Sequence, residues 1–130
     1  MTAVGIEGFD HLVLRVADTR RSVAFYGDLL GLEVLRYDEW DRGEVFFVSV
    51  RITPSTIIDL LETGSDADAA QGHLDHLCLV VDPVTDLAAL AADERFAVVE
   101  GPVPRWGARG DGTSVYVRDP DGVMVELRTY

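Results

Sequence analysis

The sequence has one cysteine, few basic residues and no long apolar run, and each shortage excludes a class of protein. Cys78 has no second cysteine to pair with, so no internal disulfide forms and the fold depends on packing. No apolar run approaches the roughly 20 residues that a membrane-spanning helix needs. The first residues show neither the basic start nor the apolar stretch of a secretory signal. We therefore expect a soluble protein of the cytoplasm.

The charge balance excludes two further kinds of partner. Eleven Lys and Arg residues stand against 23 Asp and Glu residues, which gives a net charge of −12. Such a field repels the phosphates of nucleic acids and the anionic surface of a membrane. The chain of 130 residues, 48% of them hydrophobic, has the size and composition of one ordinary globular domain. A small molecule is the partner that these numbers leave open.

An internal repeat organises the chain. The segments FDHLVLRVAD and LDHLCLVVDP begin alike, and each places a histidine, His11 or His76, at the start of an alternating apolar run. Both runs are typical of β-strands, and each is followed by a helical pattern. The first helix is expected to be capped by Asp18 or Thr19 and to end at Gly31. The second is expected to begin near Pro83. The apolar residues expected to face inward from the two helices are Val23, Phe25, Tyr26, Leu29, Leu30, Leu87, Leu90 and Ala91.

Three strand-like runs follow each helix. In the first half they cover residues 32–40, 44–52 and 56–62. In the second half they cover residues 96–101, 114–119 and 123–130, with a Gly- and Pro-rich loop over 101–113 and a turn over 119–122. Each half is thus a βαβββ module.

The two modules are expected to form one domain over residues 1–130. Module 1 spans about residues 5–64, a polar linker about 65–72, and module 2 about 73–130. Neither half is long enough to bury a sheet face alone. We therefore predict an α+β fold in which both modules form a curved, eight-stranded mixed sheet with the helices outside and a cavity on the concave face.

The repeat also brings together side chains that bind metals. Strand alternation places Val13 and Arg15 on the same face as His11, and Cys78 on the same face as His76. Each half then contributes a carboxylate late in its last strand, Asp59 at 48 residues after His11 and Glu126 at 50 residues after His76.

A lone strand histidine is often merely hydrogen-bonded, but the repetition favours ligands. Two imidazoles with one or two carboxylates suit a divalent ion such as Zn, Fe, Ni, Co or Mn. We expect His11, His76 and Glu126 to be metal ligands. Asp59 is a fourth candidate, because a carboxylate among apolar neighbours needs some partner.

Other residues are candidates for catalysis or substrate binding. Glu126 or Asp59 is placed to act as a proton acceptor, and Tyr116 either donates a hydrogen bond to substrate or only packs. Arg15 either binds an anionic substrate group or pairs with one of the many acids. Trp106 is either a lid over the cavity or a covering aromatic, and Arg109 in the same loop is a further substrate-binding candidate.

Two motifs resemble a known superfamily. The stretch DHLVLRVADTRRSVAFYGDLLGLEV is similar to the opening of the vicinal oxygen chelate superfamily, which includes glyoxalases, bleomycin-resistance proteins and extradiol dioxygenases. The ending TSVYVRDPDGVMVELRTY resembles its closing pattern, which delivers the last metal-binding Glu. The resemblance covers about residues 9–130. It implies that His11, His76 and Glu126 are the metal ligands, and that Asp59 stands where relatives have Glu or Gln.

The resemblance implies three possible functions. The first is a metal-dependent lyase or isomerase of glyoxalase type, in which the ion chelates vicinal oxygens and stabilises an enediolate-type intermediate. Arg15 would then grip an anionic end of a thiol cofactor. The second is an iron(II) ring-cleaving dioxygenase that uses only His11, His76 and Glu126. The third is an antibiotic-binding protein without catalysis. A homodimer is expected under each.

Overall fold

The structure of the 130-residue chain is a computed structural model that describes residues 7–64, 74–107 and 109–130. The predicted linker, about residues 65–72, lies outside the described residues. The chain divides into two compact units, Met1–Ala67 and Asp68–Tyr130, and each is described by itself. In the described part, no helix has the length and apolar character needed to cross a membrane.

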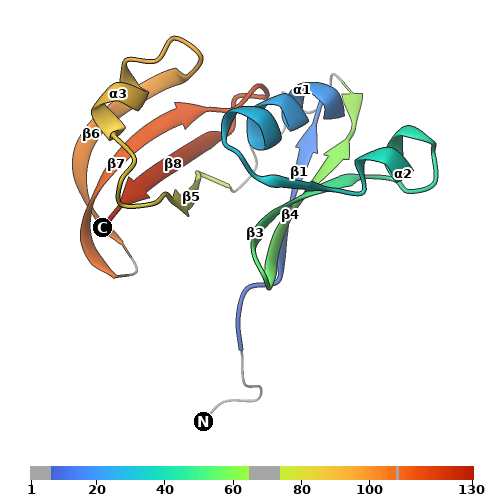
Figure 1. The fold of residues 1–130 in the computed structure, drawn as a ribbon, viewed down its shortest axis with the longest axis horizontal. Helices are drawn as coiled ribbons and strands as arrows, with labels where there is room; N and C mark the ends of the chain where they lie inside the picture. Colours follow the sequence, from blue (N-terminus) through green and yellow to red (C-terminus); the bar gives the residue numbers. More distant parts are fainter. Residues whose placement is uncertain (1–6, 65–73, 108) are drawn as a thin grey trace. The chain divides into compact units, whose positions relative to one another are not determined.

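The first unit is a four-stranded mixed sheet covered by a helix (Figure 1). Its strand order is β1-β4-β3-β2, with β1 and β4 parallel and the other neighbours antiparallel. The elements are β1 (His11–Val16), α1 (Thr19–Val23), the π-helical turns η1 (Ala24–Leu29), β2 (Glu33–Leu35), α2 (Tyr37–Asp41), β3 (Val48–Thr53) and β4 (Thr56–Glu62).

The second unit repeats this topology. Its strand order is β5-β8-β7-β6, again with the first and last strands parallel. The elements are β5 (Leu77–Val80), α3 (Leu87–Ala91), β6 (Ala97–Gly107), β7 (Gly110–Arg118) and β8 (Met124–Thr129). The predicted α+β class and the two βαβββ modules are confirmed. The eight strands are hydrogen-bonded as two mixed sheets of four, one in each module, rather than as one sheet of eight.

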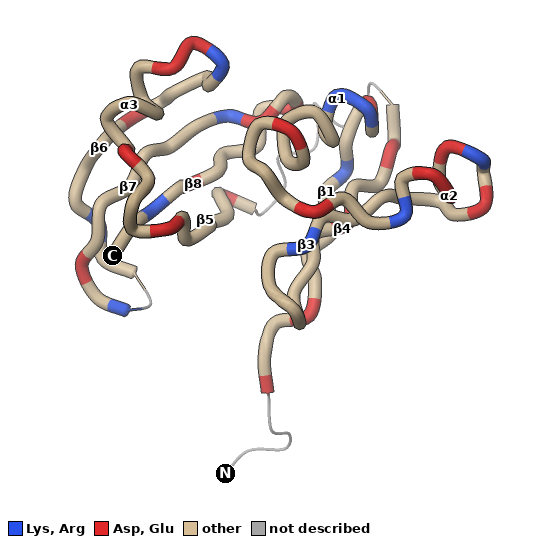
Figure 2. The backbone as a smooth tube through the Cα atoms, viewed as in Figure 1, with Lys and Arg blue, Asp and Glu red and all other residues tan. Residues whose placement is uncertain are grey.

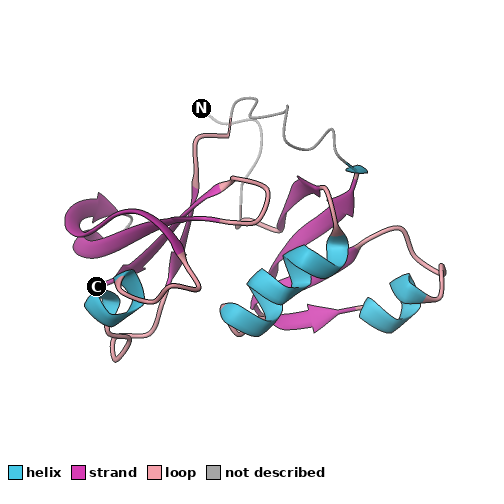
Figure 3. Cartoon of the chain, turned by 90° about the horizontal axis from the view of Figure 1, so that it is seen from above, coloured by secondary structure: helices cyan, strands magenta, loops and turns pink. Residues whose placement is uncertain are grey.

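The first helix forms where the sequence predicts it. The Asp18 side chain accepts a hydrogen bond from the backbone N–H of Arg21 at 3.1 Å, as an N-cap residue does. The helix continues through η1 and stops before Gly31, whose φ of 77° suits a residue without a side chain. It lies along one face of the sheet (Figure 3), where Tyr26 is fully buried in the same core as Leu60.

Three predicted boundaries are wrong for local reasons. The strand expected over residues 32–40 ends at Leu35, because Arg36 adopts a left-handed φ of 66° and the chain turns into α2. The second helix begins at Leu87 rather than near Pro83, since the Asp86 side chain caps it by accepting from the N–H of Ala89 at 3.0 Å. The loop expected over 101–113 is mostly strand, because β6 and β7 extend into a long hairpin.

All basic residues of the chain are arginines. Figure 2 shows that the segment around α2 carries acids and arginines close together in sequence, as expected of a solvated surface helix. Arg20 pairs with Asp41 there, and Arg42 with Glu44 at 2.9 Å. Exposed pairs of this kind contribute little to stability, typically about 0–1 kcal/mol.

Candidate functional site

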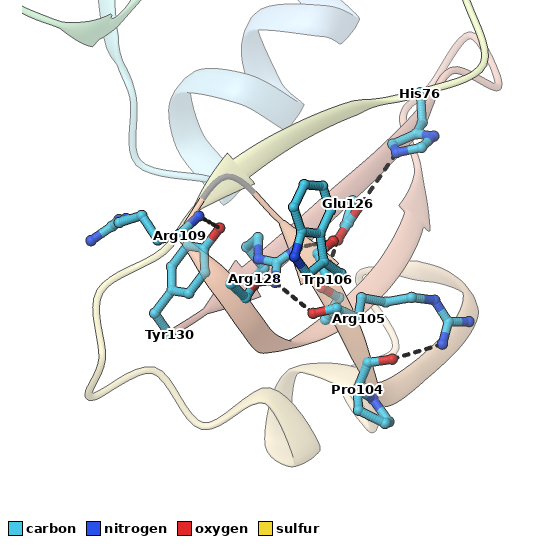
Figure 4. A network of polar contacts seen from close by, with 10 residues as sticks. His76, Pro104, Arg105, Trp106, Arg109, Glu126, Arg128 and Tyr130 are labelled. Carbon is cyan, nitrogen blue, oxygen red and sulfur yellow. Dashed lines mark hydrogen bonds and ion pairs between the residues drawn. The ribbon is translucent and has the colours of Figure 1, made fainter.

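His76 and Glu126 meet on one face of the second sheet. The parallel register pairs Cys78 with Glu126, so Glu126 lies on the face that Cys78 shares with His76 two positions earlier. Nε2 of His76 lies 3.2 Å from Oε1 of Glu126. Figure 4 marks this contact with a dashed line between the two side chains. The Glu126 carboxylate is buried, with 6% of its side chain exposed, whereas 36% of the His76 side chain remains exposed. The pair therefore combines a buried base with a reachable imidazole.

The second nitrogen of His76 is occupied by its neighbour in sequence. Oδ2 of Asp75 lies 2.6 Å from Nδ1 of His76. A carboxylate that accepts a hydrogen bond from Nδ1–H fixes the tautomer in which Nε2 carries a lone pair. Metal-binding histidines are commonly held in this way. Two donors bound to one ion at about 2.0–2.2 Å lie roughly 3 Å apart, close to the spacing of His76 Nε2 and Glu126 Oε1. The donor set of this module therefore fits a divalent ion.

The first module repeats the arrangement. Val13 is paired with Asp59, which places Asp59 on the face of His11. Oδ2 of Asp10 lies 2.7 Å from Nδ1 of His11. The hydrogen bond that His11 donates to Asp10, aided by the charge of Asp59, raises the pKa of His11 above its usual value. Each module thus holds an Asp–His pair and one buried carboxylate in equivalent register.

A serine fixes each buried carboxylate. The Ser49 hydroxyl donates to Oδ1 of Asp59 at 2.6 Å, and the Ser114 hydroxyl donates to Oε2 of Glu126 at 2.6 Å. Both serines are themselves buried. Neither serine was predicted from the sequence. The signal for Ser49 was a hydroxyl between two valines, and the signal for Ser114 was a serine that begins the apolar part of β7; each lies on the strand next to the one that carries the acid.

The candidate metal-binding side chains of each module are one histidine and one carboxylate. Across residues 7–64, 74–107 and 109–130, no group of three or more His, Cys, Asp and Glu side chains lies close enough to hold an ion. The predicted ligand set of His11, His76, Glu126 and Asp59 therefore stays a prediction, with one half placed in each module.

Comparisons with known proteins identify the family. The sequence model of the Glyoxalase/Bleomycin resistance protein/Dioxygenase superfamily matches residues 8–127. The chain belongs to this superfamily. It is 30% identical to the virulence protein STM3117 of Salmonella typhimurium, over 96% of this chain and 85% of that protein. It is 32% identical to a lactoylglutathione lyase of the same species, over 90% of this chain and 88% of that protein. A solved glyoxalase/dioxygenase from Nostoc punctiforme has a TM-score of 0.75 and 27% identity, covering 99% of this chain and 94% of that one.

One buried arginine of this superfamily member was missed by sequence reasoning. Arg128 follows Glu126 by two positions on β8, so both side chains lie on one face of the sheet. Only 3% of Arg128 is exposed, and its Nη1 lies 3.3 Å from Oε2 of Glu126. Its other hydrogen-bond acceptors are backbone carbonyls of the β6–β7 hairpin (Figure 4), and its guanidinium lies 4.6 Å from the centre of the Tyr130 ring. An arginine at this spacing from a buried acid was the available signal.

Tyr116 lies beside the His76–Glu126 pair. It is the direct partner of Glu126 in the β7–β8 register, and its ring meets the His76 ring edge-on at 5.9 Å. The Arg105 guanidinium lies 5.7 Å from the centre of the Tyr116 ring on another side. Partial burial, together with the charge of Glu126, raises the pKa of Tyr116. The phenol therefore keeps its proton at neutral pH and is a hydrogen-bond donor next to the pair.

The candidate substrate-binding residues lie at exposed positions. Arg15 shares the exposed face of β1 with His11. Trp106 is 80% exposed, on β6 rather than in the flexible loop that the sequence suggested. The Arg109 guanidinium stacks 4.5 Å from the centre of the Tyr130 ring, while the Arg109 backbone N–H donates to the Tyr130 hydroxyl at 3.0 Å. Trp106 and Arg109 thus sit near the tip of the same hairpin.

Proposed function

We propose that the protein is a metal-dependent enzyme of glyoxalase type that acts on a small substrate with two neighbouring oxygens. The observation that carries the proposal is the Asp75–His76–Glu126 arrangement, with His76 Nε2 and Glu126 Oε1 3.2 Å apart. The equivalent Asp10, His11 and Asp59 support it, because a repeat of the same three groups favours ligands over incidental polar contacts. Relatives named lactoylglutathione lyase favour a lyase or isomerase.

His76 Nε2 and Glu126 Oε1 would hold the ion in the second module, and His11 and Asp59 are the candidate ligands in the first. A divalent ion, when bound, acts as a Lewis acid on adjacent substrate oxygens. Fe, Ni, Zn, Co and Mn are the candidate metals, because their divalent ions accept imidazole together with carboxylate. The Asp–His hydrogen bonds keep both imidazoles oriented and supply basic Nε2 atoms.

Proton transfer falls to the buried carboxylates. Oε2 of Glu126 is already engaged by Ser114 and Arg128, so Oε1 would alternate between holding the ion and accepting a proton removed from substrate. Asp59 is the second candidate base, with Oδ1 engaged by Ser49. The protonated Tyr116 hydroxyl would donate a hydrogen bond to a substrate oxygen. Trp106 and Arg109 in the second module, and Arg15 in the first, are the candidates for binding the remainder of a substrate.

The first experiment is elemental analysis of protein purified without chelators, for wild type, His11→Ala, His76→Ala and His73→Ala. His73 is the remaining histidine of the sequence and serves as the matched control. We expect near-stoichiometric metal in wild type and in His73→Ala, and loss in the other two. Loss in His76→Ala alone would restrict the site to the second module. Absence of metal from wild type, even after reconstitution with each of the five ions, would overturn the proposal.

The second experiment identifies the reaction. The metal-loaded protein is tested with hemithioacetals of small dicarbonyls, and the iron(II) form with catechols. Turnover of a hemithioacetal, lost in Glu126→Gln, is expected. Ring cleavage of catechol in its place would assign the protein to the dioxygenases of the superfamily.

The assembly is part of the proposal. We expect a cytoplasmic homodimer, so light scattering should give twice the 14.2 kDa mass of the chain. A single species at the mass of one chain would contradict the dimer and leave the metal site unaffected.

A further inference from the structure

Arg128 joins Glu126 to the tip of the β6–β7 hairpin. A guanidinium has five N–H donors. Nη1 lies 3.2 Å from the Trp106 carbonyl and 3.3 Å from Oε2 of Glu126. Nη2 lies 2.8 Å from the Arg105 carbonyl and 3.4 Å from that of Gly110. Four donors are thereby directed to acceptors, three of them in one hairpin.

Glycines in the β6–β7 hairpin leave room for the Arg128 guanidinium. A Cβ atom built on Gly107 would lie 2.4 Å from Nη1 of Arg128 and 2.5 Å from its Cζ, closer than real Cβ contacts come. A Cβ on Gly112 would lie 2.5 Å from the Thr129 carbonyl oxygen and 2.7 Å from Nη2. Gly107 has no positive φ that would demand glycine, so the close approach of Arg128, and of the Tyr130 hydroxyl at 2.6 Å, is the reason that its side chain must be absent.

The fifth donor of Arg128, its Nε–H, indicates that the side chain is held for its position and not for the number of hydrogen bonds it can form. Nε of Arg128 is buried and has no hydrogen-bond partner among the residues that the structure describes. A buried N–H without a partner costs free energy, so a side chain selected for stability alone would be expected to avoid this arrangement. The ion pair with Glu126 and the hydrogen bonds to three backbone carbonyls offset this cost.

The geometry points to Arg128 as a positioning residue that couples the β6–β7 hairpin tip to the orientation of Glu126. Together with Ser114, it binds Oε2 and leaves Oε1 directed at His76. A movement of Arg105, Trp106 or Gly110 displaces a carbonyl that accepts from the Arg128 guanidinium, and the guanidinium then shifts relative to Glu126. Contact of a substrate with Trp106 would therefore change the orientation of Glu126, the proposed metal ligand. The inference rests on the proposed function in taking Glu126 Oε1 as a ligand.

The test measures zinc affinity of the folded protein by competition with a chromophoric chelator, for wild type, Arg128→Met, Arg128→Lys and Gly107→Ala. Loss of a partner that orients a ligand typically weakens metal binding about 10–100-fold. We expect such a loss in Arg128→Met and, although Gly107 binds no metal, in Gly107→Ala. Arg128→Lys should be intermediate, since an ammonium keeps the charge but not the fork of donors. Gly8→Ala is the matched control, because an added methyl there has no atom within 4 Å.

A merely structural Arg128 gives a different result. Its variants would unfold at lower temperature but bind zinc with wild-type affinity while folded, and that outcome would overturn the inference. Wild-type affinity in Gly107→Ala together with a loss in Arg128→Met would also overturn it, because the hairpin would then not be coupled.

A metal-free measurement separates this inference from the proposed function. Glu126→Gln should shift the backbone amide resonances of Trp106, Gly107 and Gly110, and the shift should disappear when both proteins carry Arg128→Met. This holds even if wild type binds no ion, which would defeat only the proposed function. Unchanged hairpin resonances in Glu126→Gln would defeat the coupling, whatever the metal analysis shows. Asp93→Asn, which alters an ion pair with Arg95 next to α3, is the control.

Discussion

Oδ2 of Asp75 lies 2.6 Å from Nδ1 of His76, although neighbouring residues in a regular strand point to opposite faces. The contact is possible because β5 begins only at Leu77, so both residues precede the strand. Asp10 likewise precedes β1 and lies 2.7 Å from Nδ1 of His11. The Asp-His-Leu sequence of each repeat thus builds an oriented imidazole at the start of a strand.

Replacing Asp75 or Asp10 by Asn should weaken metal binding without unfolding the protein. An amide is neutral and leaves the imidazole less basic and less firmly oriented, so we expect a loss of about 10–100-fold in affinity. Isothermal titration with zinc measures it. Asp93→Asn, which breaks the exposed ion pair with Arg95, should leave the affinity unchanged. Equal affinities for Asp75→Asn and wild type would show that the Asp–His contact has no part in binding.

Removing Ser49 or Ser114 should destabilise the fold. Each hydroxyl donates to a buried carboxylate at 2.6 Å, and hydrogen bonds to charged groups contribute about 1.5–3 kcal/mol. We expect Ser49→Ala and Ser114→Ala to lower the free energy of unfolding by this amount in urea titrations. Ser55→Ala, at an exposed position between β3 and β4, should change it by less than about 0.5 kcal/mol. If the free energy of unfolding changed by this little in both Ser49→Ala and Ser114→Ala, the two serines would not stabilise the buried carboxylates.

The fold was predictable wherever the sequence repeats or alternates. The run Thr56–Glu62 was predicted to the residue, and β1 alternates in burial as its pattern required. The predictions failed where a backbone conformation has no clear mark in the sequence. An arginine gives no sign in the sequence of a left-handed φ, so the sequence predicted a strand where α2 forms after Arg36. Glycine and proline over residues 101–113 were taken for a loop, whereas several of them make room within a hairpin.

The candidate site was predictable only as a list of donors. The equal spacing of the repeats identified His11, His76, Asp59 and Glu126, and the register places each acid on the face of its histidine. The groups that orient them were not predicted. Ser114 and Arg128 act on Glu126 from β7 and from two positions along β8, and contacts of this kind depend on side-chain direction rather than on residue type.

The pKa of His11 should be measurably high. Its hydrogen bond to Asp10, and then the charge of Asp59, favour the protonated ring, so its NMR titration should have a midpoint above 6.5. A raised folded-state pKa contributes stability below pH 6.5 that is lost as the pH rises through the folded value. Metal affinity should run the other way and fall as the pH drops through that value, because the ion needs the neutral ring.

The Asp10→Asn variant is the control for this titration. It removes the larger of the two favourable contacts, so the midpoint should move down toward 6.5. A midpoint in Asp10→Asn equal to that of wild type would assign the raised pKa to other charges.

The Cys78 thiol should be unreactive although it is exposed. Desolvation by its surroundings, followed by the charge of Glu126, raises its pKa to about 11. Because the thiolate is the nucleophile, at pH 8 its concentration is about one hundredth of that of an ordinary thiol with a pKa of 9.0, and alkylation by iodoacetamide should slow in proportion. The rate should rise with pH toward a midpoint near 11. Glu126→Gln removes the negative charge and should speed alkylation at pH 8, whereas Glu94→Gln, at an exposed position after α3, should not. A rate in wild type equal to that of free cysteine would contradict both the desolvation of Cys78 and the effect of the Glu126 charge on its pKa.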